Sequence, residues 1–232
     1  MFDKAPLKIR TMFDQISPRY DFLNHLLSLN SDVLWRRKAA ALLEGAKRVL
    51  DVCSGTGDLA IEIHRRWGAE VVGSDFAFRM LEIARLKAAR RSLGSHVRFQ
   101  QADTLRLPYQ DGVFDASTVA FGIRNVVDTE RGIREMARVI RTGGRVVILE
   151  FTLPENALLR QGYLAYFGNV LPRIGRMIAR SEIDAYKYLP DSVARWPRPA
   201  ELQSIMERSG LRDVSYDLVF GGVAAVHTGL KA

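Results

Sequence analysis

The chain has 232 residues, 47% of them hydrophobic and 26% charged, a balance that is typical of a folded globular protein and argues against intrinsic disorder. A chain of this length is expected to form one domain with a substantial core. Its net charge of +8 favours an acidic partner, which includes nucleic acid, an anionic membrane surface and an anionic substrate, and does not choose among them.

Residues 1–46 predict a helical arm. Apolar side chains recur at the i, i+3, i+4, i+7 spacing of one helix face, at Ile9, Met12, Phe13 and Ile16. Pro18 disfavours helix at Ser17, so the first helix is expected to stop there. Because no strand pattern appears before residue 47, we expect this arm to precede and cover the rest of the fold.

Between residues 47 and 152, short apolar runs alternate with helical patterns, which predicts a parallel sheet with crossover helices. The predicted strands are 48–52, 70–75, 97–103, 113–120 and 145–151. The predicted helices are 58–67, 78–91 and 129–140. The glycines of RTGG, residues 141–144, are expected to end the last of these helices.

Residues 153–197 break this alternation, since the segment is aromatic, rich in arginine and helical in its middle. We interpret it as an insertion over the substrate side. A further helix is predicted at 199–210, followed by strands 211–220 and 223–232. Their Gly221-Gly222 link is typical of an antiparallel hairpin. The core of the single predicted domain is therefore formed by residues 47–152 and 198–232.

The sequence also limits where the protein works. One cysteine, Cys53, excludes an intramolecular disulfide, and no Cys/His spacing predicts a metal site. The amino-terminal MFDKAPLKIR does not resemble a signal peptide, and no apolar run approaches the roughly 18 residues of a membrane-spanning helix. We expect a cytoplasmic protein, and peripheral contact with the cytoplasmic membrane face stays open.

A glycine-rich loop follows the first predicted strand. VLDVCSGTGDLA, residues 49–60, places Asp51 at the strand end and Gly55, Thr56 and Gly57 before the next helix. The glycines allow positive φ, so a ligand can lie against main-chain amides at the helix start. The same residues fit a dinucleotide fingerprint, with Asp75 in the place of a ribose-binding acid. The loop alone therefore does not identify its ligand.

Carboxylates around the loop favour S-adenosylmethionine over a dinucleotide. A pyrophosphate would be repelled by Asp51 and Asp58, whereas the sulfonium and ammonium of S-adenosylmethionine are cations. Phe76, next to the ribose acid, is included among the cofactor residues. Asp103, after the third strand, is expected to accept from the adenine amine, with Thr104 alongside.

Less specific interpretations apply to each of these residues. A single strand-end acid often only caps a turn, and Asp58 is expected to cap or charge the helix start. Cys53 is interpreted as a packing residue because no His or Lys lies near it in sequence to lower its pKa. The functional prediction depends on the order of the acids, each at the carboxyl end of a successive strand.

Several motifs together resemble the ubiquinone/menaquinone biosynthesis C-methyltransferase family over nearly the whole chain. They are VLDVCSGTGDLA, VAFGIRNV (119–126), RTGGRVVILEF (141–151) and MFDQISPRYDFLNHLLSLNSDVLWRR (12–37). The resemblance implies an α/β, Rossmann-like class I methyltransferase fold with a mostly parallel seven-stranded sheet. It also implies methyl transfer from S-adenosylmethionine to a ring carbon of a polyprenylated quinol, either the menaquinone precursor demethylmenaquinol or the ubiquinone precursor.

The resemblance assigns cofactor contacts to Thr56, Asp75, Asp103, Thr104 and Ala120. Ala120 departs from a serine found in some relatives of the family. A backbone contact at this position would persist, but a hydroxyl contact would be lost. The resemblance is compatible with a homodimer and with peripheral contact with a membrane.

The chemistry of the expected reaction gives roles to three residues. A quinol carbon becomes nucleophilic when an adjacent hydroxyl loses its proton, so the site needs a base and a group that stabilises the oxyanion. Arg124, after the fourth strand, is expected to hold the phenolate or orient a proton-accepting water, and Asn125 to orient Arg124. Tyr20 resembles a substrate-facing tyrosine of the family. The alternative for Arg124 is a solvated loop charge.

The insertion has two interpretations. Its apolar and aromatic residues could receive the prenyl tail while arginines meet anionic lipid headgroups, namely Arg160, Arg173, Arg176 and Arg180. The alternative is a lid helix packed on the core with solvated arginines.

Other functions fit only part of the sequence. A methyltransferase acting on oxygen or nitrogen of another small molecule would not explain FGIRN or the arm. A nucleic-acid methyltransferase, and hence a nucleic-acid partner, is disfavoured because there is no D/N-P-P-Y/F/W motif and no interleaved aromatic-basic stripe. A non-catalytic S-adenosylmethionine-binding subunit of a quinone-biosynthesis complex and an NAD-binding dehydrogenase stay open.

Overall fold

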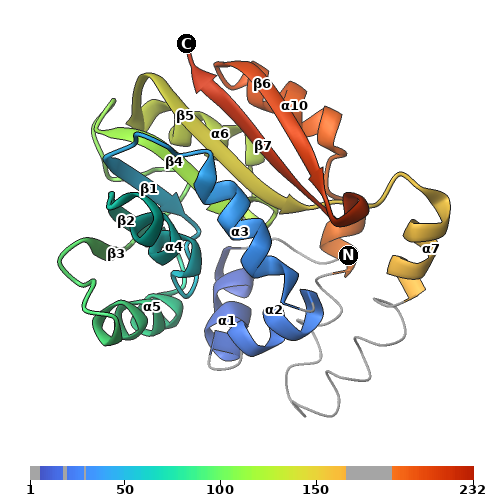
Figure 1. Ribbon diagram of the computed structural model, residues 1–232, viewed down its shortest axis with the longest axis horizontal. Coiled ribbons are helices and arrows are strands. Elements are labelled where there is room, and N and C mark those ends of the chain that lie inside the picture. Colours follow the sequence, from blue (N-terminus) through green and yellow to red (C-terminus); the bar gives the residue numbers. More distant parts are fainter. Residues whose placement is uncertain (1–5, 18–19, 29, 166–189) are drawn as a thin grey trace.

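The computed structural model describes residues 6–17, 20–28, 30–165 and 190–232. Its centre is a seven-stranded sheet in the order β3-β2-β1-β4-β5-β7-β6 (Figure 1). Neighbouring strands are parallel, except that β7 runs antiparallel to β5 and β6. The predicted fold class is therefore confirmed. The strands are β1 (Arg48–Val52), β2 (Glu70–Asp75), β3 (Val97–Gln101), β4 (Phe114–Ala120), β5 (Ile140–Phe151), β6 (Leu211–Val219) and β7 (Ala224–Lys231).

Helices cover both faces of this sheet. On one face lie α3 (Ser31–Ala41), α4 (Asp58–Trp67) and α5 (Phe78–Arg90), and on the other α6 (Thr129–Val139) and α10 (Pro199–Arg208). β1 supplies buried side chains to both cores, with Val49 in the first and Leu50 in the second. A strand covered on both faces has no solvent-facing side, which explains why Val49, Leu50 and Val52 do not alternate with exposed polar residues.

Two glycine pairs have different roles from each other. Gly221 and Gly222, at φ +70° and +88°, join β6 to β7 as predicted. The glycines of RTGG do not end α6, and that prediction was wrong. β5 already begins at Ile140, and Gly143 and Gly144 lie where its register with β4 shifts. A Cβ on Gly144 would come within 2.6 Å of the Asp115 carbonyl oxygen, so close backbone approach explains this glycine.

The arm is helical and lies against the carboxyl end of β2. It consists of α1 (Pro6–Ile16), α2 (Tyr20–Ser28) and α3, and α1 ends just before Pro18. Ile16 packs on Ala77 and Met80, the residues that follow β2. The Arg79 amide also donates to Asp14 Oδ1 at 3.1 Å. These contacts place the arm above the edge of the sheet at which ligands bind in α/β folds.

The segment after β5 begins with α7 (Ala157–Ala165), which contains Arg160. The other arginines expected to meet lipid, Arg173, Arg176 and Arg180, lie outside the described residues. Within the described ranges, no helix combines the length and the apolar character needed to cross a membrane.

Candidate active site

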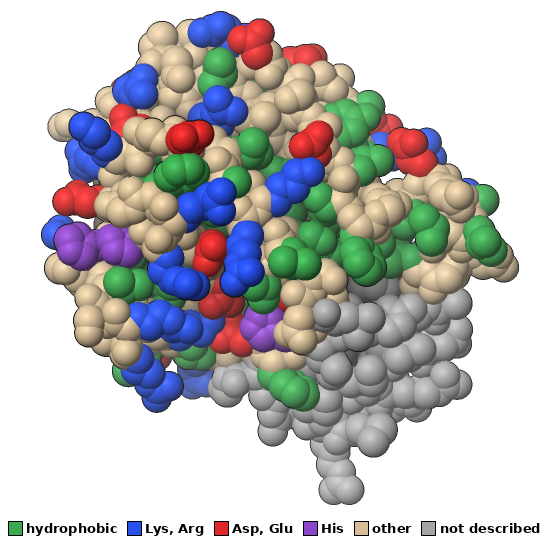
Figure 2. All heavy atoms as spheres, viewed as in Figure 1, with side chains coloured by type: hydrophobic (Ala, Val, Ile, Leu, Met, Phe, Trp, Pro, Cys, Tyr) green, Lys and Arg blue, Asp and Glu red, His purple; other side chains and the backbone are tan. Residues whose placement is uncertain are grey.

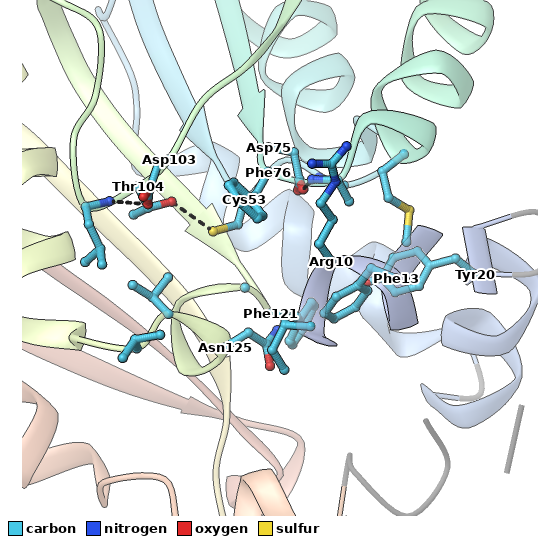
Figure 3. Close-up of a pocket in the computed structure, with 18 residues that line it drawn as sticks. Arg10, Phe13, Tyr20, Cys53, Asp75, Phe76, Asp103, Thr104, Phe121 and Asn125 are labelled. Atoms are coloured by element: carbon cyan, nitrogen blue, oxygen red, sulfur yellow. Dashed lines mark hydrogen bonds between the residues drawn. The ribbon is translucent and has the colours of Figure 1, made fainter. Parts of the chain in front are cut away.

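A cavity lies where the arm meets the carboxyl ends of the parallel strands (Figure 3). A neighbouring pocket shares Tyr20 and Gly55 with it and extends to Asp51 and Ala120. Side chains from three parts of the chain line the main cavity: Ile9, Phe13 and Tyr20 of the arm, Cys53, Asp75 and Asp103 at strand ends, and Phe121, Asn125 and Val126 after β4.

The glycine loop has the backbone conformation predicted for it. Gly55 and Gly57 have φ of +54° and +84°. A Cβ on Gly57 would lie 2.6 Å from Cζ of Phe99, so both conformation and packing require glycine there. Gly55 lines the cavity, which leaves room for a ligand close to the main chain.

Asp75 is held in place by main-chain amides. Gly55 N donates to Asp75 Oδ2 at 2.9 Å, and Ala77 N donates to Oδ1 at 2.8 Å. Burial raises the pKa of Asp75, while the amides of Ala77 and Gly55 oppose the rise. Its carboxylate and Phe76 both line the cavity, where each oxygen of Asp75 retains a lone pair for a ligand hydroxyl.

Asp51 is only partly compensated for its burial. It is 1% exposed, and neither carboxylate oxygen makes a hydrogen bond of good geometry with the residues that the structure describes. Burial raises its pKa well above the ordinary value, and the positive charge of Arg36 and the nearby backbone amide of Ala60 oppose this rise. A buried carboxylate of this kind is costly unless a cation or donor joins it, so a cationic ligand would compensate Asp51.

The loop is joined to the arm by a network that the sequence did not predict. Thr56 Oγ1 donates to Asp21 of α2. Nζ of Lys87, in α5, lies 2.6 Å from both Asp21 Oδ2 and Asp58 Oδ1. It also donates to Thr56 Oγ1 at 3.1 Å. Asp58 is the first residue of α4 and thus charges the helix start as expected, but its side chain pairs with Lys87. Asp21 and Lys87 are far apart in sequence, so no local spacing indicated their contact.

Asp103 and Thr104 also reach the cavity. The Leu105 amide donates to Asp103 Oδ1 at 2.9 Å, which orients the carboxylate after β3. Thr104 Oγ1 lies 3.4 Å from Sγ of Cys53. Burial and the charge of Asp75 raise the pKa of Cys53, so the thiol stays protonated at neutral pH. This supports the packing role expected for Cys53.

The chain leaves β4 through a constrained turn. Phe121 has φ +59°, which is rare for a residue other than glycine. A Cβ on Gly122 would lie 2.3 Å from Cβ of Cys53, so the turn packs directly on the glycine-loop strand. Ala120, just before the turn, lines the pocket beside Asp51. Local strain of this kind is concentrated at functional sites.

Arg124 is not a solvated loop charge, and that alternative was wrong. Its side chain is 7% exposed, and Nη1 donates to Glu150 Oε1 and to the Phe121 carbonyl, each at 2.6 Å. The guanidinium also lies 5.4 Å from the centroid of Phe151. Arg124 is not among the described residues that line the cavity, although its neighbour Asn125 is. The structure therefore places Arg124 in a buried ion pair next to the site.

Glu150, near the end of β5, is the partner that sequence reasoning missed. It accepts from Arg124 Nη1 and from the Phe151 amide, the latter at 2.9 Å. Burial raises the pKa of Glu150, and the charge of Arg124 opposes the rise. The available signal was an acid in the otherwise apolar run VVILEF, residues 146–151, which is unusual for a buried strand.

Tyr20 begins α2 and faces the cavity from the arm (Figure 3). Its ring packs edge-on against the ring of Phe13, with 6.0 Å between the two ring centroids. Burial raises the pKa of Tyr20, while Asn24 and the charge of Arg124 oppose the rise. The hydroxyl is therefore neutral near pH 7 and suited to donate or accept a hydrogen bond.

The chain matches a known family along almost its full length. A family model described as the ubiE/COQ5 methyltransferase family matches residues 1–231. The chain belongs to the ubiE/COQ5 methyltransferase family. It is 49% identical over 221 residues to "Demethylmenaquinone methyltransferase" of Thermus thermophilus, with 94% of this chain and 99% of the relative covered. It is 45% identical over 228 residues to "Ubiquinone/menaquinone biosynthesis C-methyltransferase UbiE" of a Geobacter species, with 97% and 96% covered.

A solved structure supports the fold. A SAM-dependent methyltransferase from Thermotoga maritima superimposes with a TM-score of 0.68 at 21% identity, covering 97% of this chain and all of the other. The family membership confirms the predicted methyltransferase and its methyl donor, S-adenosylmethionine, and excludes the dehydrogenase alternative. The roles of the individual site residues stay predictions.

Proposed function

We propose that this ubiE/COQ5 methyltransferase methylates a ring carbon of demethylmenaquinol, a polyprenylated quinol, to give menaquinol. The proposal rests on the 49% sequence identity to the Thermus thermophilus demethylmenaquinone methyltransferase, which extends over 94% of this chain. The Geobacter relative is named for both quinones, so the ubiquinone precursor is the second candidate acceptor.

The strand-end residues fit S-adenosylmethionine. Asp51 is buried without a partner among the described residues, which suits the cofactor's ammonium. We assign the ribose hydroxyls to Asp75 and the adenine amine to Asp103, because main-chain amides hold both carboxylates in fixed orientations. The bound cofactor supplies an electrophilic methyl group on a sulfonium. We assign the remaining contacts to Gly55, Thr56, Gly57, Phe76, Thr104 and Ala120, all of which except Gly57 line the two adjoining pockets.

On the acceptor side, we assign Arg124 to stabilising the quinol phenolate through its charge. Its hydrogen bonds to Glu150 and Phe121 hold the guanidinium still, and such preorganised charge is effective in a water-poor site. The charge of Arg124 acts to lower the pKa of Tyr20, which lines the cavity, so the guanidinium is close enough to influence a group on the cavity wall.

Proton removal is assigned to water rather than to a side chain. The guanidinium of Arg124 stays protonated, and the raised pKa of Tyr20 makes its phenolate scarce at neutral pH. Tyr20 and Asn125 line the cavity and can orient a water that takes the quinol proton. The phenolate then directs negative charge into the ring carbon, which attacks the methyl group in line.

Labelling tests this function directly. Purified protein is incubated with S-adenosylmethionine carrying a labelled methyl group and with demethylmenaquinone kept reduced. We expect label on the ring carbon of menaquinone and none when the quinone is kept oxidised, because only the quinol can form the phenolate. Absence of ring label under reducing conditions, with cofactor binding intact, would overturn the proposal.

We also propose that the protein contacts a membrane peripherally to reach its lipid-soluble acceptor. Hydrophobic side chains gather beside α7 and the β6–β7 turn (Figure 2). Leu158 is 78% exposed and Phe220 68% exposed. The ring of Trp35 in α3 contacts Phe220, which connects this surface to the arm. Apolar groups on a basic protein suit an anionic bilayer.

Vesicle co-sedimentation tests this contact. We expect the protein to sediment with anionic phospholipid vesicles and the Leu158→Ser/Phe220→Ser variant to do so at least about threefold less. Equal sedimentation of the two proteins would contradict the assignment of this surface. The homodimer stays a prediction.

A further inference from the structure

Arg36 is a buried cation whose hydrogen bonding is incomplete. It lies in α3, with its side chain 10% exposed and its Nη1 donating to Asp32 one turn earlier. The guanidinium lies 5.6 Å from the centroid of Phe121. Its other N–H groups have no hydrogen-bond partner in the part of the chain that the structure describes. The ion pair with Asp32 therefore uses only part of the hydrogen-bonding capacity of the Arg36 guanidinium.

Those donors border the pocket that also contains Asp51. Arg36 is the one Lys or Arg among the described residues that line this pocket. Lys87, the nearby lysine, is already shared between Asp21 and Asp58. The pocket thus contains a cation with donors to offer and a buried carboxylate that has no partner within the described ranges.

A zwitterion matches this pair of groups. The amino-acid end of S-adenosylmethionine carries an ammonium and a carboxylate on the same carbon, so a ligand whose ammonium meets Asp51 brings its carboxylate into the same pocket. A guanidinium is the side chain best suited to a carboxylate, because its planar N–H groups bind both oxygens.

We propose that Arg36 binds the carboxylate of the cofactor's amino-acid end, opposite Asp51. Asp32 holds the guanidinium by Nη1, and Phe121 packs on it, so the remaining donors are fixed in direction before the cofactor arrives. α3 of the arm thereby takes part in cofactor recognition. The inference rests on the methyl donor and is independent of which quinol is methylated.

Two ligands separate this role from a purely structural one. The dissociation constant of S-adenosylhomocysteine is measured by titration calorimetry beside that of its analogue without the carboxylate, 5′-deoxy-5′-(3-aminopropylthio)adenosine. We expect the wild-type protein to prefer S-adenosylhomocysteine by about 10–100-fold, the range for a charged hydrogen-bonded pair. Arg36→Gln should remove most of this preference and leave affinity for the analogue within about threefold.

The neighbouring arginine supplies a matched control. Arg37 is half-exposed beside Glu62, and Arg37→Gln should keep the wild-type preference. Asp51→Asn should weaken both ligands, because both carry the ammonium. If Arg36→Gln does not fold, Arg36→Lys replaces it and should lower the preference at least about threefold, since a lysine lacks the planar pair of donors.

Three outcomes would overturn the proposal: no preference in the wild-type protein, an unchanged preference in the Arg36 variant, or an equal loss of both ligands. None of these measurements uses the methyl acceptor. A failure to methylate demethylmenaquinol would therefore leave this inference standing.

Discussion

The two parts of the cavity that we assign to the cofactor and to the acceptor are built differently. On the cofactor side, Asp51, Asp75 and Asp103 lie at or just after successive strands, and main-chain amides orient Asp75. On the acceptor side, the buried ion pair of Arg124 with Glu150 joins two elements that are distant in the chain. Local backbone geometry thus positions the strand-end acids, whereas the acceptor side depends on a charge pair that forms only after folding.

This difference has a consequence for mutational sensitivity. An amide donor cannot be removed by changing a side chain, so the orientation of Asp75 resists substitution around it. A buried ion pair depends on both partners, and loss of one leaves an uncompensated charge. We therefore expect single substitutions on the acceptor side to have the larger effects on stability.

Loss of the Glu150 carboxylate should give the largest effect. Glu150→Gln leaves the buried Arg124 charge without its ion partner, so we expect the free energy of unfolding to fall by about 3–5 kcal/mol. We expect kcat to fall about 100-fold through misplacement of the guanidinium, with the dissociation constant of S-adenosylhomocysteine changed less than about threefold. Denaturant unfolding, turnover and calorimetry measure the three quantities.

The same substitution at Glu130 is the control for this prediction. Glu130 pairs with Arg134 on the exposed side of α6, and Glu130→Gln should cost less than about 1 kcal/mol. Glu150→Asp should restore part of the lost kcat, because it keeps the negative charge. Full turnover in a folded Glu150→Gln protein would show that Arg124 does not depend on this partner.

Asp51→Asn should raise the stability of the ligand-free protein and weaken its binding of the cofactor. Burial raises the pKa of Asp51, so the folded state binds its proton more tightly than the unfolded chain does. The ligand-free wild-type protein should therefore gain stability relative to the variant as the pH falls through that raised pKa. At neutral pH we expect the variant to melt about 2–4 °C higher and to bind S-adenosylhomocysteine about tenfold more weakly.

The pH series decides this second prediction. The difference in Tm between Asp51→Asn and the wild-type protein should shrink steadily as the pH is lowered, because the wild-type carboxylate becomes neutral. A difference that stays constant with pH, or a variant that is less stable at neutral pH, would mean that Asp51 already has a stabilising partner in the ligand-free protein.

Loosening the arm should give the smallest effect. Asp21→Asn weakens the contacts of α2 with Lys87 and Thr56, and we expect a loss of about 1 kcal/mol in unfolding free energy. S-adenosylhomocysteine should dissociate a few-fold faster in stopped-flow experiments, since the arm covers the cavity. Asp217→Asn, at the exposed pair with Lys38, is the control and should leave the dissociation rate unchanged. Equal dissociation rates in the wild-type, Asp21→Asn and Asp217→Asn proteins would show that the arm does not control cofactor release.

The sequence predicted the sheet well because each element has its own local signal. In RVLDV the apolar residues Val49, Leu50 and Val52 are consecutive except for Asp51 and are all buried, as a strand covered on both faces requires, and the glycines after it permit positive φ. The prediction that RTGG ends the preceding helix was wrong because a glycine pair has the same conformational freedom at a helix end as in an irregular strand. Only the pairing of β5 with β4 separates the two cases.

Sequence order also indicated which residues lie near one another at the cavity. Asp75, Asp103 and Asn125 line it, since parallel strands deliver their carboxyl ends to the same edge, and Tyr20 reaches it from the arm. Arg124 was expected toward the substrate, and its buried ion pair with Glu150 was not foreseen. An arginine after a strand carries no local signal of its partner, which here lies on another strand.

The sequence by itself therefore determined the seven-stranded α/β fold, the family and the set of acids at the strand ends, because these follow from local periodicity, glycine conformation and motif order. Only the tertiary structure decided which charges meet: Glu150 with Arg124, Lys87 with Asp21 and Asp58, and Arg36 with Asp32 beside Asp51. The physical reason is that an ion pair depends on distance in space, and folding brings together residues whose separation in the chain gives no indication of it.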